Sequence, residues 1–124
     1  MPRFHDNACD ALVKHVLAKP GGWPKADLVH QQREVERVRW LHEEACRRYR
    51  AVLASGVRPE VYEAWCPVRG ESYTRVYYPE PLRQARAGRR MAWRDLVCER
   101  RVLQAYEEAR HAARLARRAE TRSP

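Results

Sequence analysis

KADLVHQQREVERVRWLHEEACRRYRAVLAS, residues 25–55, decides the fold of this 124-residue chain. Core-type positions recur here at alternating spacings of three and four residues, the a/d pattern of a helix that packs along one face. This seam covers almost four heptads, although two of its members are polar: Leu28, Gln31, Val35, Val38, His42, Ala45, Tyr49 and Val52. The segment therefore predicts one long helix, with Gly56 in the C′ position that ends it.

Helical patterns also lie on both sides of this segment. Residues 6–19 predict a short helix, capped by Asp6 or Asn7 and ended by the Pro- and Gly-rich stretch at 20–24. Residues 80–120 predict a second long helix. Because an unbroken helix of that length would run about 60 Å, we expect a break near Gly88 or a protruding end.

Between the long helices, residues 61–78 are β-branched and aromatic around Arg69-Gly70, which predicts a small β-hairpin. A short helix over residues 59–65 is the alternative, since Pro59 suits a first helical position. We therefore expect a mainly α single domain over residues 1–124. It would hold two long, roughly antiparallel helices, a short N-terminal helix and the hairpin.

The charge is the strongest functional signal. The chain carries 22 Arg, only 3 Lys and no Ile, with a net charge of +9. A GC-rich genome, such as that of a bacterium or its phage, explains why the chain uses Arg far more often than Lys. It does not explain the excess of cations over anions, which sits mainly in residues 82–124. A basic surface of this kind predicts nucleic acid, or a nucleic-acid-bearing complex, as the partner.

One helix face concentrates the arginines of that region. Five of them fall within an arc of about 80° on a helix, and no acidic residue occurs between Pro81 and Asp95. We expect this face to follow a phosphate backbone, the alternative being a solvated surface that contacts nothing. The candidate nucleic-acid-binding residues are Arg83, Arg86, Arg90, Arg94 and Arg101.

Residues 56–81, which include the hairpin, are the one segment with a net negative charge, and they are rich in aromatic side chains. We expect it to contact a protein partner or a second copy, with Trp65 and Tyr77 as anchors on a shared face. Packing into the core and stacking against unpaired bases are the alternatives.

Other functional classes have less support. Cys9, Cys46, Cys66 and Cys98 form no C-x-x-C motif, so we expect reduced thiols and neither a cofactor nor a metal. Disulfides and a zinc site from His5, Cys9, His42 and Cys46 are the weaker alternatives. No catalytic motif indicates an enzyme, and no apolar stretch suits a membrane. The function expected is that of a cytoplasmic or virion-associated accessory protein of a phage or mobile element. The rival is a virion structural component or inhibitor that acts by protein–protein contacts.

Overall fold

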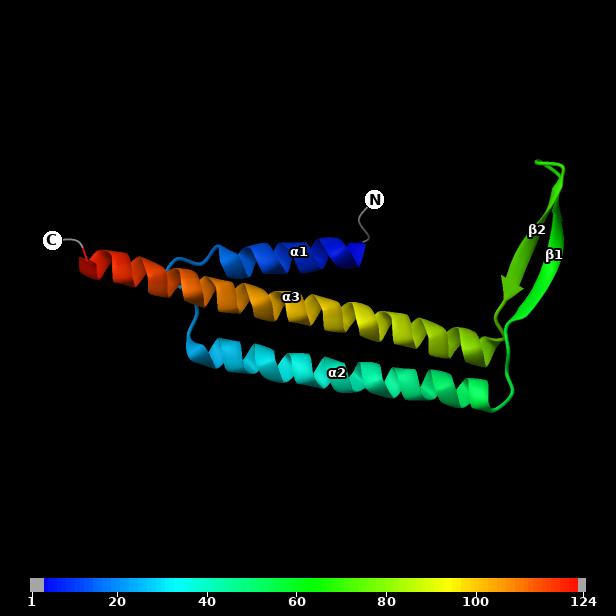
Figure 1. Ribbon diagram of the computed structural model, residues 1–124, viewed down its shortest axis with the longest axis horizontal. Coiled ribbons are helices and arrows are strands. Elements are labelled where there is room, and N and C mark those ends of the chain that lie inside the picture. The colour runs from blue at the N-terminus through cyan, green and yellow to red at the C-terminus, as the bar shows by residue number, and fades with distance from the viewer. Residues whose placement is uncertain (1–3, 123–124) are drawn as a thin grey trace. The chain divides into compact units, whose positions relative to one another are not determined.

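The computed structural model describes the backbone of residues 4–122 and the side chains of residues 7–122. It confirms the predicted fold class, with two long, roughly antiparallel helices, a short helix and a two-stranded antiparallel hairpin (Figure 1). In chain order the elements are α1 (Phe4–Leu17), α2 (Lys25–Ala54), β1 (Glu60–Cys66), β2 (Glu71–Tyr77) and α3 (Glu80–Arg122).

The chain groups into two compact units, which are described separately. The first, called the stapled unit below, contains α1, α2 up to Trp40 and α3 from Trp93 onward. The second, called the hairpin unit, is residues 41–92 and contains the end of α2, the hairpin and the start of α3. The expectation of a single domain stays a prediction.

Two local details of the predicted helices differ in the structure. α1 begins at Phe4, so Asp6 and Asn7 lie inside its first turns and the predicted cap at these residues is wrong. α3 is continuous through Gly88, where a break had been one of the two options. The end of α2 agrees with the prediction: Gly56 follows it with a φ of 96°, a conformation that a side chain rarely tolerates.

In the stapled unit, α3 is covered on two sides. Val35 and Val38 of α2 form a buried cluster with Leu96 of α3, and Leu103 packs against it. On the other side, Val16 of α1 forms a second buried cluster with α3. The α2 seam predicted from the sequence therefore forms the core here, including the polar Gln31, which is buried.

Gln31 is tolerated in the core because its amide is satisfied. Its Nε2 donates to the main-chain oxygen of Glu99 at 3.0 Å and to the Glu99 carboxylate at 2.5 Å. Burying an amide without such partners would cost on the order of 1–3 kcal/mol, so the pairing explains how a polar residue occupies a seam position.

The turn between α1 and α2 is fixed by Trp23. Its indole Nε1 donates to the Val16 carbonyl at 2.8 Å, and its ring meets Tyr106 edge-on at 5.4 Å. Burial raises the pKa of Tyr106, and the nearby Asp27 carboxylate adds to this effect. Gly22 passes close to α3, where a Cβ would lie 3.1 Å from the Ala113 methyl group. Glycine is therefore needed for this approach.

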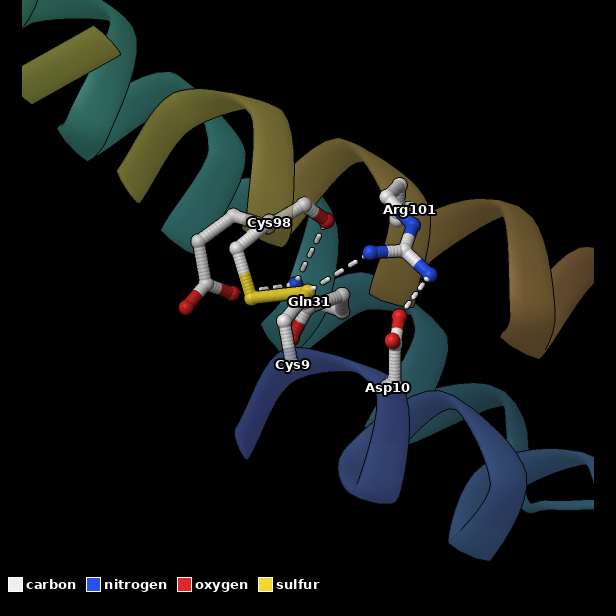
Figure 2. Close-up of a disulfide and its surroundings, with 6 residues drawn as sticks. Cys9, Asp10, Gln31, Cys98 and Arg101 are labelled. Atoms are coloured by element: carbon white, nitrogen blue, oxygen red, sulfur yellow. Dashed lines mark hydrogen bonds and ion pairs between the residues drawn. A yellow bond between two sulfur atoms is a disulfide. The ribbon is translucent and has the colours of Figure 1, made fainter. Parts of the chain in front are cut away.

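A disulfide joins α1 to α3 in the stapled unit, between Cys9 and Cys98 (Figure 2). The prediction of four reduced thiols is wrong for this pair and agrees with the structure for Cys46 and Cys66, which are free. The two bonded cysteines are 89 residues apart, so only the packing of α1 on α3 brings them together.

In the hairpin unit, the two strands pair from Glu60 opposite Tyr77 to Cys66 opposite Glu71 (Figure 1). This confirms the predicted hairpin, although the four residues 67–70 connect the strands rather than a turn at Arg69-Gly70 alone. The buried residues of this unit are Leu82 and Ala85 near the start of α3. Its core is therefore small.

Candidate nucleic-acid interface

The hairpin unit holds three of the five arginines predicted to bind nucleic acid. Arg83 and Arg90 are exposed on α3 and form no ion pair in the described part of the chain. Arg86 is half-buried, with its guanidinium 4.3 Å from the centre of the Tyr78 ring. The cation–π contact holds the guanidinium in place over the ring. The N–H groups at the edge of the guanidinium can still donate hydrogen bonds to a ligand.

The other two predicted residues lie in the stapled unit. Arg94 is half-buried on α3. Arg101 is engaged internally, because its guanidinium donates to Asp10 of α1 at 2.5 Å and lies 3.5 Å from the Cys9 sulfur (Figure 2). A carboxylate already occupies the fork of Arg101 that a phosphate would need. The structure therefore gives Arg101 a structural contact between α1 and α3.

The end of α2 contributes arginines that the sequence analysis did not single out. Residues 45–59 contain four Arg and no acidic residue, like residues 81–92 of α3. Three of the four lie in α2 and Arg58 follows it, while Arg47 is ion-paired with Glu44. Arg89 of α3 lies 4.0 Å from the Tyr49 ring of α2, which brings the two segments into contact. The sequence does show residues 45–59 as a second stretch without acidic residues. Only the pairing of α2 with α3 places this stretch beside residues 81–92.

A shallow groove of about 340 Å³ lies where these two helical segments meet. Arg48 of α2 supplies the charge, and the α3 side is lined by Pro81, Gln84 and Gly88. Gly88 has open space where a side chain would stand. Ala45, Val52 and Ala85 complete the lining, so the groove combines one guanidinium and one amide with small apolar side chains.

The hairpin is exposed on both faces in the described structure. Directly paired residues of an antiparallel sheet share a face, so odd-numbered residues of β1 lie with even-numbered residues of β2. One face, the tyrosine face, carries Tyr62, Tyr73, Arg75 and Tyr77; the other, the tryptophan face, carries Val61, Trp65 and Val76.

The expectation that Trp65 and Tyr77 share a face is therefore wrong. Trp65 pairs with Ser72, whereas Tyr77 pairs with Glu60, and these pairs point to opposite sides of the hairpin. Both rings are exposed, Trp65 at 63% and Tyr77 at 48%, so neither belongs to a core. Each remains a candidate contact residue, but they cannot anchor one partner surface together.

The proposed metal ligands are not assembled. Cys9 is bonded to Cys98, and the side chain of His5 lies outside the described residues. Cys46 lies 3.6 Å from His42 on the same helix. Within residues 7–122, no group of three or more His, Cys, Asp or Glu side chains is placed to hold a metal ion. In the same region, no helix has the length and apolar character to cross a membrane.

Comparisons with known proteins give no further guide to the function. No protein-family model matches the chain, and neither a curated protein nor a solved structure matches it.

Proposed function

We propose that this chain is a small, non-catalytic accessory protein that binds nucleic acid through the arginines of the hairpin unit. The observation that supports it best is the charge of two segments of that unit, the end of α2 with the loop that follows it and the start of α3. Residues 45–59 and 81–92 together contain eight Arg and no Asp or Glu. Binding phosphates to such a surface releases condensed counterions, which drives association without sequence readout.

The geometry suits this role in two ways. Arg83 and Arg90 are free to move toward a phosphate, whereas Arg86 and Arg89 are held over tyrosine rings. A guanidinium that is already ordered loses less rotamer entropy when it binds an anion. The unit thus offers both adaptable and preorganised cations.

Salt dependence tests the proposal. A labelled nucleic acid is titrated with protein by fluorescence anisotropy over a series of salt concentrations. The slope of log affinity against log salt is about −0.9 for each phosphate contacted on duplex DNA. Changing Arg83, Arg86 and Arg90 together to Gln should therefore make the slope shallower by about 2 to 3.

A matched control separates location from net charge. Arg114, Arg118 and Arg122 are exposed at the other end of α3, in the stapled unit. Their triple change to Gln removes the same charge and should leave most of the slope. Equal flattening by both variants, or unchanged binding after the first, would remove the hairpin unit's arginines from the mechanism.

A second candidate function is protein–protein contact through the hairpin, as in a virion component or an inhibitor. The tryptophan face favours it, since Val61 and Trp65 are 67% and 63% exposed. Apolar patches of this kind often mark interfaces. Because Trp65 and Tyr77 lie on opposite faces, Trp65→Ser and Tyr77→Ser should be tested separately, by sedimentation velocity of the purified protein. An interface on the tryptophan face predicts dissociation with Trp65→Ser alone.

The same proposal includes an origin in a phage or mobile element. It also includes a cytoplasmic or virion-associated location. The Cys9–Cys98 disulfide weighs against a permanently reducing compartment, where such bonds are rarely kept. Thiol titration of the protein, taken rapidly from cells under acid, measures whether the pair is oxidised there.

A further inference from the structure

The tyrosine face of the hairpin has a regular chemical pattern. Along β2, Tyr73, Arg75 and Tyr77 occupy alternate positions and so project from one face, with about 7 Å between successive residues. Tyr62 of β1 pairs directly with Arg75. The face therefore presents a ring, a guanidinium and a ring in a row, with a third ring beside the guanidinium.

These rings are open to a ligand. The exposed fractions of Tyr62, Tyr73 and Tyr77 are 44%, 44% and 48%, and the whole of β2 is exposed. A hairpin with two strands has no second layer to bury them. Tyrosine combines a flat apolar ring with a hydroxyl that bonds to water, so three such rings tolerate exposure better than aliphatic side chains do.

The charges around the face define the ligand further. Its carboxylates stand at the two ends, Glu60 opposite Tyr77 and Glu71 opposite Cys66. The two middle pairs, Tyr62–Arg75 and Ala64–Tyr73, hold a cation and no carboxylate. A polyanion crossing the middle of the face would meet Arg75 and the rings. The same unit carries the arginines of residues 45–59 and 81–92 for the rest of the backbone.

We infer that the tyrosine face binds unpaired bases, and that the ligand class of the hairpin unit is single-stranded nucleic acid. This inference rests on the proposed function, because the arginines supply the phosphate contacts. Bases inside a duplex hide their faces from an external ring, whereas every unpaired base offers one. The tryptophan face lacks an arginine among its strand residues and does not share this pattern.

The experiment compares two labelled probes, an oligothymidine of about 20 nucleotides and a duplex of the same length. Wild-type protein should bind the single strand more tightly at equal salt. Changing Tyr62, Tyr73 and Tyr77 together to Val keeps strand propensity and removes the rings. Since each ring that is removed can no longer stack on a base, single-strand affinity should fall about tenfold or more, with duplex affinity within about twofold.

Two control variants keep the result interpretable. The corresponding triple change to Phe retains the rings and should retain single-strand affinity, which shows that stacking rather than the fold of the hairpin was tested. Trp65→Val alters the opposite face and should leave both affinities unchanged. Circular dichroism of each variant verifies that the helices are intact.

The outcomes separate this inference from the proposed function. Equal affinity for both probes, or unchanged single-strand affinity after the Val changes, overturns the inference while binding through arginines stands. Failure of the wild-type protein to bind either probe overturns both. A change of oligomeric state in the Val variant, without a selective loss of single-strand binding, overturns the inference in favour of a second copy as the occupant of the face.

Discussion

The same kinds of side chain have different roles in the stapled unit and in the hairpin unit. In the stapled unit, polar groups are paired within the protein: the buried Gln31 bonds to Glu99, and the partly exposed Arg101 bonds to Asp10. In the hairpin unit, Arg83 and Arg90 lie at the surface without an ion-pair partner in the described residues, and aromatic rings of the strands are exposed. We therefore expect the stapled unit to supply most of the stability, and the binding surface proposed above to lie on the hairpin unit. The predictions below test that division.

The largest effect is expected from the disulfide. Closing a loop of 89 residues restricts the unfolded chain, and the chain-entropy relation gives about 4 to 5 kcal/mol. Changing Cys9 and Cys98 to Ala, or reducing the protein, should lower the free energy of unfolding by up to this amount in urea titrations. The double change of Cys46 and Cys66 to Ser is the control. A stable reduced protein would show that packing alone holds α1 on α3.

The next effect compares a buried residue with exposed ones. Leu96 is 2% exposed between α2 and α3, so Leu96→Ala should cost about 2–5 kcal/mol. The double change of Trp65 and Tyr77 to Ser should leave the helical circular dichroism and thermal melting of the helices nearly unchanged, because both rings are exposed. Collapse of helicity in the double variant would place these rings in the core and contradict the division.

The buried amide gives a smaller effect. Gln31→Ala removes both hydrogen bonds to Glu99 and leaves a carboxylate beside a cavity. The free energy of unfolding should fall by about 1–3 kcal/mol. Gln32→Ala, one residue along on the exposed side of α2, is the matched control and should change it by less than about 0.5 kcal/mol. Equal effects at both positions would mean that the assigned helix face is wrong.

Features set by local sequence were predictable, and features set by tertiary packing were not. The seam of α2 and the cap at Gly56 follow from spacing along one helix, and Val35 and Val38 lie where that spacing puts them. The Cys9–Cys98 bond depends on two helices meeting 89 residues apart, which no local pattern encodes. Likewise, the separation of Trp65 from Tyr77 depends on which residues pair across the strands. The internal role of Arg101 needed the position of Asp10.

The smallest effect tests that role of Arg101. Its ion pair with Asp10 is partly exposed, with side-chain exposures of 44% and 47%, so solvent screens it. A double-mutant cycle with Arg101→Gln and Asp10→Asn should give a coupling free energy of about 0–1 kcal/mol in urea titrations.

Arg101→Gln should also leave the salt slope of nucleic acid binding unchanged, because the guanidinium is already occupied. Arg90→Gln, on the same helix face without an ion-pair partner in the described residues, should reduce that slope by about 0.9. If Arg101→Gln reduces the slope as much, then phosphate displaces Asp10 and the arginine face predicted from the sequence extends into the stapled unit.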